Sequence, residues 1–105
     1  MSKMLVVFTT VPNKEEGETL ARKIVEQRLG ACVQVLPQMT SFYFWEGEIQ
    51  KDSEHLILIK TLSEKYKDLQ DFIIKNHSYS VPEIIALSAQ DVFRGYLEWA
   101  EDYLL

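Results

Sequence analysis

Apolar residues follow two different periods along this chain. Continuous apolar runs rich in β-branched residues predict strands at residues 4–10, 31–36, 54–61 and 83–89. The second run continues in extended form over residues 40–45 and ends in a predicted turn at Glu46-Gly47-Glu48.

Apolar residues spaced three and four positions apart predict three helices between and after these runs. The first helix is expected to begin at the N-cap Asn13, with Glu16 completing a capping box, and to stop at Gly30. A second capping box at residues 61–64 predicts the start of the next helix, and the last helix is expected over residues 92–104.

The resulting order is β-α-β-β-α-β followed by a helix, which predicts an α+β fold of the ferredoxin-like type in one domain over residues 1–105. No helix separates the second strand from the third, so these two strands are expected to form an antiparallel hairpin. Right-handed crossovers place both connecting helices on one face of the sheet and leave the other face bare.

The bare face is expected to be covered by another copy of the chain. A sheet face in water shows polar residues at alternate positions, but these strands are apolar on both faces, as in Val6/Phe8 and Leu5/Val7. The consecutive aromatic residues Phe42–Trp45 push rings out of both faces of the hairpin. The C-terminal helix can cover only part of this surface, so the sequence predicts an oligomer; the alternative is that the aromatic strand folds into its own core.

Composition excludes several classes of function. The net charge of −5 and the pI near 5.0 argue against a binder of the nucleic-acid backbone, which needs a basic face, and the sequence has no RNA-binding or Gly-rich phosphate motif. No apolar run approaches the roughly 20 residues of a membrane span. The single cysteine and the lack of an export pattern favour a reduced thiol in a cytoplasmic protein.

Cys32 and His77 are the residue types best suited to bind copper or zinc. They lie far apart in sequence, so a metal site would have to be assembled in space between copies of the chain, with Glu54, Glu83 and His55 as secondary ligands. Each has a purely structural alternative: a core position for Cys32, a helix end for His77 and a cross-strand surface position for His55. The Cys32–His77 pair has no third orienting residue, so no enzymatic activity is expected.

The segment after the second helix predicts one wall of a cleft. Pro82 restricts the residue before it to an extended conformation, so the loop is expected to present Tyr79 and Glu83 from a rigid backbone, unless it is a plain connection. Trp45 is expected to line the same cleft or to anchor an interface. Lys60 would bind an anion in this cleft, formed between subunits, or would extend its ammonium into water while its stem packs on the protein.

Five segments carry distinctive motifs: residues 30–33 (GACV), 41–47 (SFYFWEG), 54–61 (EHLILIKT), 77–84 (HSYSVPEI) and 96–99 (YLEW). In this order and at these spacings they resemble the CutA family of divalent-cation tolerance proteins over essentially the whole chain. The one departure is Ser78, where the family usually has proline in a His-Pro-Tyr run, and this departure predicts a looser loop.

The resemblance implies a compact homotrimer of ferredoxin-like subunits with strand contacts between subunits, similar to the trimeric PII signalling proteins. It also implies a role in tolerance of divalent metals through a bound divalent cation, copper first and zinc second, without catalysis. The alternative is a PII-like trimeric sensor that binds a small molecule or anion through Lys60 and is read by a partner protein.

Overall fold

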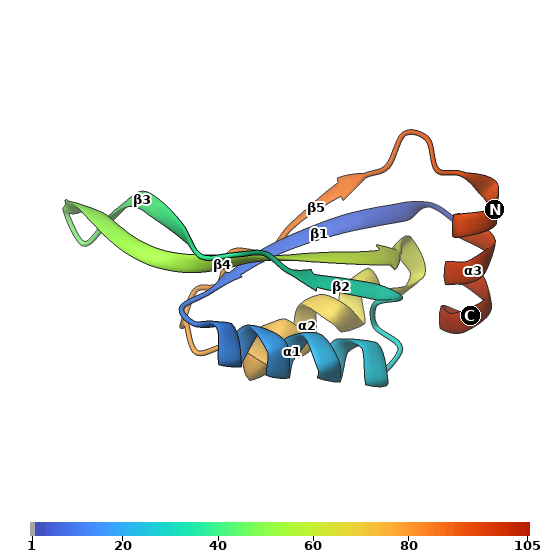
Figure 1. The fold of residues 1–105 in the computed structure, drawn as a ribbon, viewed down its shortest axis with the longest axis horizontal. Helices are drawn as coiled ribbons and strands as arrows, with labels where there is room; N and C mark the ends of the chain where they lie inside the picture. The colour runs from blue at the N-terminus through green and yellow to red at the C-terminus, as the bar shows by residue number, and fades with distance from the viewer. Residues whose placement is uncertain (1) are drawn as a thin grey trace.

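The computed structural model describes residues 2–105 and has the predicted order of elements (Figure 1). The strands are β1 (Met4–Val11), β2 (Cys32–Val35), β3 (Met39–Trp45), β4 (Glu48–Leu62) and β5 (Ile85–Ser88). The helices are α1 (Lys14–Glu26), α2 (Tyr66–Asn76) and α3 (Arg94–Leu104), with a 3₁₀ turn, η1 (Ser63–Lys65), before α2.

All strand pairs are antiparallel, in the order β2-β4-β1-β5, and the ferredoxin-like arrangement predicted from the sequence is confirmed. β4 is long enough to pair with both β2 and β3: its second half lies beside β2 and its first half beside β3. The outer half of this hairpin projects beyond the rest of the sheet, at the opposite end from α3 (Figure 1). We call the paired segments Met39–Trp45 and Glu48–Glu54 the hairpin arm.

The tip of the hairpin arm is a tight turn. Glu46 and Gly47 both have positive φ, at 53° and 78°, as a two-residue type I′ connection requires. Because pairing continues to Trp45 opposite Glu48, β4 begins at Glu48 and not at Glu54 as predicted.

Helices α1 and α2 cover one face of the sheet, as predicted (Figure 1). Alternate residues of β1 and β4 on this face, including Val7, Ile57 and Ile59, are fully buried against Ile24 of α1 and Leu69 of α2. This layer is the main core of the molecule, and it forms because each helix presents a single apolar stripe to the sheet.

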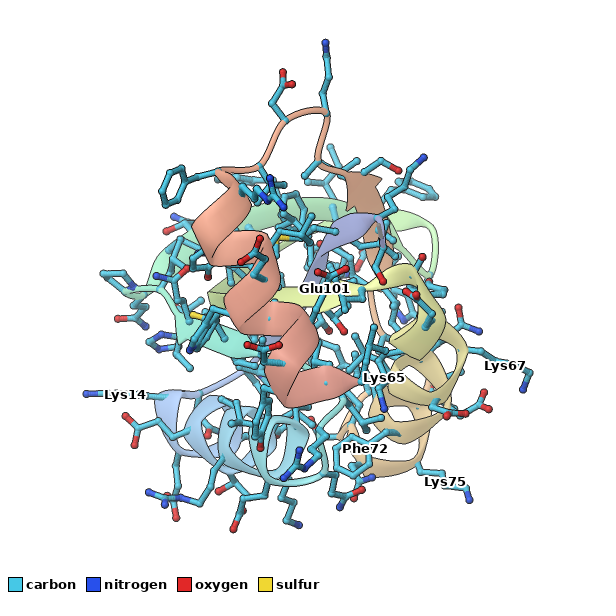
Figure 2. The ribbon with its side chains drawn as sticks, turned by 90° about the vertical axis from the view of Figure 1, so that its right-hand side faces the viewer. Lys14, Lys65, Lys67, Phe72, Lys75 and Glu101 are labelled. Atoms are coloured by element: carbon cyan, nitrogen blue, oxygen red, sulfur yellow. The ribbon has the colours of Figure 1, made fainter. Side chains whose placement is uncertain are left out.

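Helix α3 covers one end of the second face. Leu97, Ala100 and Leu104 of α3 pack on Met4 and Leu62 at the ends of β1 and β4. Figure 2, which looks at the molecule from this end, shows α3 lying across it. The prediction that α3 leaves much of this face bare is therefore confirmed for one chain.

Between α3 and the loop that carries Tyr79, the second face has no helix over it within residues 2–105. Ile85 is 48% exposed and Leu87 is 50% exposed, and both stand beside residues of β1.

None of the helices within residues 2–105 combines the length and apolar character needed to cross a bilayer.

The end of α1 differs from the prediction. Arg28, not Gly30, is the left-handed residue that ends the helix, with φ of 57°. The Leu29 amide donates to the Ile24 carbonyl and the Arg28 amide to the Val25 carbonyl, which is the Schellman pattern. Gly30 serves close packing instead, because a Cβ there would lie 2.9 Å from Cγ2 of Ile59.

The predicted capping box of Thr61 and Glu64 does not form. β4 runs on to Leu62, and the buried Thr61 hydroxyl donates to the Leu29 carbonyl at 2.7 Å. The other two boundaries shift less: β5 is confined to the residues that pair with β1, and α3 begins at Arg94 after the uncapped Phe93.

Candidate functional site

The hairpin arm and the loop between α2 and β5 border an open cleft of about 640 Å³. Tyr43 and Trp45 alternate along β3, so both rings lie on the same face of the arm. Glu54 of β4 and the loop residues Tyr79 and Glu83 line the cleft with them. Four residues singled out from the sequence (Trp45, Glu54, Tyr79 and Glu83) are therefore brought together here.

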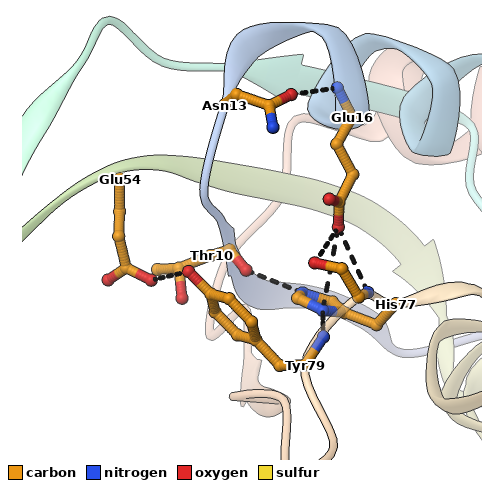
Figure 3. A network of polar contacts seen from close by, with 7 residues as sticks. Thr10, Asn13, Glu16, Glu54, His77 and Tyr79 are labelled. Carbon is orange, nitrogen blue, oxygen red and sulfur yellow. Dashed lines mark hydrogen bonds and ion pairs between the residues drawn. The ribbon is translucent and has the colours of Figure 1, made fainter.

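Tyr79 and Glu54 form the polar centre of the cleft. The Tyr79 hydroxyl donates to Oε2 of Glu54 at 2.8 Å, which joins the loop to β4 (Figure 3). Burial raises the pKa of Tyr79 well above its usual value, and the hydrogen bond to the Glu54 carboxylate raises it further. The phenol therefore remains a neutral donor to the carboxylate over the ordinary pH range.

A second phenol and carboxylate lie further out on the hairpin arm. The Tyr43 hydroxyl donates to Oδ2 of Asp52, and this hydrogen bond is the main cause that raises the pKa of Tyr43. Asp52 and Glu54 are two residues apart on β4 and so point to the same side as Tyr43. The Tyr43 phenol and the carboxylates of Asp52 and Glu54 thus lie on the same face of the arm.

His77 supports Tyr79 from behind. Its Nε2 lies 2.7 Å from the Thr10 carbonyl, and its Nδ1 lies 3.0 Å from the Tyr79 amide nitrogen (Figure 3). The carbonyl can only accept and the amide can only donate, so Nε2 carries the proton and Nδ1 is the acceptor. The His77 and Tyr79 rings also contact each other, with centroids 4.8 Å apart.

Both ring nitrogens of His77 are thus occupied by backbone groups. A metal ion bound at His77 would have to displace the amide of Tyr79 or the carbonyl of Thr10. In the single chain, His77 positions the loop.

Ser78 ties the same loop to α1. Its hydroxyl donates to Oε2 of Glu16 at 2.8 Å and its amide donates to the same oxygen at 3.3 Å (Figure 3). The missing proline predicts a looser loop, and these two hydrogen bonds to Glu16 are the restraint that the structure offers in its place. Asn13 is the N-cap as predicted, since its Oδ1 accepts from the Glu16 amide, but the Glu16 carboxylate binds Ser78 and does not complete the predicted capping box.

Cys32 and Lys60 lie away from the cleft. They face each other across β2 and β4, and Lys60 pairs in turn with Val6 of β1. Val6 precedes Thr10 by four residues on β1. At the rise of a strand, the row of Cys32, Lys60 and Val6 therefore lies about 13 Å from Thr10. Lys60 donates to Oε1 of Gln34 at 2.8 Å and does not line the cleft, and the half-buried Cys32 lies near Tyr96 of α3.

His55, the last candidate metal ligand, also has a backbone partner in the single chain. His55 Nδ1 lies 2.8 Å from the Leu36 carbonyl, where the edge of the sheet passes from β2 to β3. Among residues 2–105 no three side chains of His, Cys, Asp or Glu converge as a ready-made metal site. One chain therefore brings carboxylates and phenols together but leaves Cys32 and His77 apart.

Three residues of this region were missed by the sequence analysis. Tyr43 and Asp52 have the same strand parity as Trp45 and Glu54, so alternation along a long hairpin would have placed them in the cleft region. Glu16 gave no such signal, because three strands and a helix separate it in the chain from its partner Ser78.

Comparison with known proteins gives the family of this chain. The family model described as CutA1 divalent ion tolerance protein matches residues 5–103. The "Divalent-cation tolerance protein CutA" of Thermus thermophilus is 42% identical over 97 residues, covering 92% of this chain and 94% of that protein. "Protein CutA, chloroplastic" of Arabidopsis thaliana is 45% identical over 98 residues, but this chain spans only about half (54%) of its length.

The fold agrees with solved structures of the same family. The crystal structure of CutA1 from Oryza sativa superposes with a TM-score of 0.96 at 41% identity, covering 99% of this chain and 95% of that one. The Thermus thermophilus structure gives a TM-score of 0.89 at 43% identity, covering 91% of this chain and 93% of that one. Sequence and fold agree along almost the whole described chain, which therefore belongs to the CutA1 divalent ion tolerance protein family.

Proposed function

We propose that this protein contributes to divalent-cation tolerance by binding the cation directly, copper first and zinc second, without catalysing a reaction. One observation carries the proposal: every charged side chain that lines the cleft is a carboxylate, Glu54 and Glu83. Carboxylates of this kind attract divalent cations, and phenols and water can complete the coordination.

The thiol route is the second part of the proposal. Cys32 is half-buried on the second face of the sheet, beside Tyr96 of α3, where a second copy of the chain would add ligands. A soft thiolate favours copper over the hard cations, whereas the cleft carboxylates do not discriminate in this way. His77 would join such a site only by giving up one of its backbone contacts.

The proposal includes three copies of the chain. The apolar surface left bare by α3 and the exposed Phe44 and Ile49 of the hairpin arm both support association, and the family resemblance gives the number three. A single domain and a cytoplasmic location of the protein are expectations from the sequence. For the location, one relative is named chloroplastic and one similar structure periplasmic.

The test is a calorimetric titration of the reduced, metal-free protein with Cu(II), Cu(I) and Zn(II), after light scattering has fixed the number of subunits. Glu54→Gln tests the cleft, Cys32→Ala the thiol and His77→Ala the ring, whereas Lys60→Ala tests the anion alternative. We expect stoichiometric copper binding that at least one of the first three variants weakens by about ten-fold or more. Weak binding that is indifferent to all of them would show that the metal is not this protein's ligand.

The sensor alternative makes a different prediction. A small anion bound through Lys60 should be lost in Lys60→Ala and kept in Cys32→Ala and Glu54→Gln. The ammonium of Lys60 already donates to Gln34 and stands apart from the cleft, so we place this alternative second.

A further inference from the structure

Aromatic rings form much of the wall of the cleft. Tyr43 and Trp45 project from one face of the hairpin arm, and Tyr79 projects from the loop on the other side. Tyr79 is fixed by the His77 ring behind it and by the hydrogen bond of its hydroxyl to Glu54. The faces of such rings attract positive charge, most strongly for tryptophan.

The charge of the cleft has only one sign. Glu54 is only 7% exposed, and within residues 2–105 no lysine, arginine or histidine forms an ion pair with it. Its one hydrogen-bonding side-chain partner in this part of the chain is the Tyr79 hydroxyl, as Figure 3 shows. A carboxylate this buried is normally paired with a cation, so the cleft lacks a positive group at Glu54.

The size and the apolar surface of the cleft also suit an organic cation. A volume of about 640 Å³ lies within the range of small-molecule sites, roughly 300–1,000 Å³. Met39, Leu56 and Pro82 add apolar surface that a hydrated metal ion does not use. An anion is disfavoured because Glu54 and Glu83 would repel it.

From these observations we propose that the cleft binds a small alkylated ammonium compound. The positive head group is held by the rings of Tyr43, Trp45 and Tyr79 and by the charge of Glu54, and its alkyl groups lie on the apolar wall. This binding goes beyond the proposed role in metal tolerance and does not depend on it, because it requires neither a metal nor Cys32.

The experiment is a calorimetric titration of the metal-free protein with choline and with its uncharged carbon isostere, 3,3-dimethylbutanol. We expect saturable binding of choline, and binding at least about five-fold weaker for the isostere, since only the charge differs. Spermidine, whose ammonium groups are not fully alkylated, is the third ligand. If spermidine binds and choline does not, charge attraction alone is at work and the proposal is overturned.

Variants of residues in the cleft are compared with variants of residues outside it, so that loss of a binding group is distinguished from a general effect of mutation. Trp45→Leu and Glu54→Gln should each weaken choline binding by about five-fold or more. Phe44→Leu lies on the same strand but outside the cleft lining, and Glu46→Gln lies in the turn, so both should bind as the wild type does. Circular dichroism and light scattering confirm that each variant keeps its fold and subunit number.

The remaining outcomes also decide the matter. Equal affinities for choline and its isostere, equal losses in Trp45→Leu and Phe44→Leu, or no binding to the folded wild type would each contradict an ammonium site. The last result would mean that a second copy of the chain, or nothing, fills the cleft. Because both proposals use Glu54, the copper titration is carried out without choline and is judged from its own variants, Cys32→Ala among them.

Discussion

Two threonines on the buried face of the sheet differ in one respect. Thr9 and Thr61 both have no exposed surface, but the Thr61 hydroxyl donates to the Leu29 carbonyl, whereas the Thr9 hydroxyl has no partner within residues 2–105. Valine has nearly the same shape without the hydroxyl. We expect Thr9→Val to raise the free energy of unfolding by about 1 kcal/mol, because an unpaired buried hydroxyl is removed.

Thr61→Val is the matched control, measured by the same urea denaturation. It should lower the free energy of unfolding by about 1–3 kcal/mol, since it leaves the Leu29 carbonyl without its donor. Equal effects of the two substitutions would mean that the Thr9 hydroxyl has a partner after all.

The Tyr79 phenol makes stability depend on alkaline pH. Its pKa is raised in the folded chain, so the folded state keeps the proton to a higher pH than the unfolded chain does. This contribution is fully present below about pH 10, the ordinary tyrosine value, and is lost as pH rises through the folded-state pKa. We expect the melting temperature of the wild type to fall more steeply above this pH than that of Tyr79→Phe.

Tyr43→Phe serves as the comparison, because the pKa of Tyr43 is raised in the same direction but its phenol is exposed to solvent. Its curve should stay closer to that of the wild type. Parallel curves for the wild type and Tyr79→Phe would remove the link between this phenol and alkaline stability.

At the level of elements, Arg28 both ends α1 and links it to α3. Arg28 adopts the left-handed conformation that favours glycine, and its Nη1 donates to the Tyr103 carbonyl at 2.8 Å. Its guanidinium carbon also lies 4.7 Å from the centre of the Tyr103 ring, which ties α1 to α3. Replacement by alanine keeps the strain and loses the tie, whereas replacement by glycine loses both.

We therefore expect Arg28→Ala to be less stable than Arg28→Gly by about 1 kcal/mol, the cost of a left-handed conformation for a residue with a Cβ. Arg28→Gly should stay near the wild type, because relief of strain offsets the lost contacts with Tyr103. Chemical denaturation of the three proteins gives both differences. The reverse order would show that the backbone at this position is not strained.

The two ends of α1 also show which boundaries a sequence can predict. The start was predicted correctly because the Asn13 side chain and the Glu16 amide are local partners. The end was predicted at Gly30, but the helix ends at Arg28, which is left-handed. The side chain of Arg28 contacts Tyr103, a residue distant in the chain. In the same way Thr61 was taken for a cap, and its tertiary hydrogen bond to Leu29 keeps it in the strand.

On the scale of the whole molecule, three of the four residues predicted to line one cleft do line it. Trp45, Tyr79 and Glu83 were expected in one cleft and do line it, together with Glu54. Lys60 was expected with them, but its strand register places it in the row of Cys32. The first strand of the arm and its turn at Glu46-Gly47 were predicted, but β4 was begun at Glu54, so its first part, residues 48–53, was missed.

The hairpin arm leads to the last prediction. On the face opposite the cleft it carries Phe44, which is 72% exposed, paired with Ile49, which is 78% exposed. Exposed apolar pairs on a projecting arm are typical of contacts with another chain. We expect the double variant Phe44→Ser/Ile49→Ser to form fewer oligomers at a given concentration than the wild type, as light scattering would measure.

Ile74→Ser is the control, since Ile74 is also an exposed isoleucine (53%) but lies on α2, in the helical layer away from the arm. It should leave the subunit number unchanged. If association stabilises the fold, the melting temperature of the wild type should also rise with protein concentration, because the oligomer is favoured by mass action and the unfolded chain is not. The double variant should lose most of this dependence. A wild type that is monomeric, with a melting temperature independent of concentration, would leave the bare sheet face and the arm without the partner proposed for them.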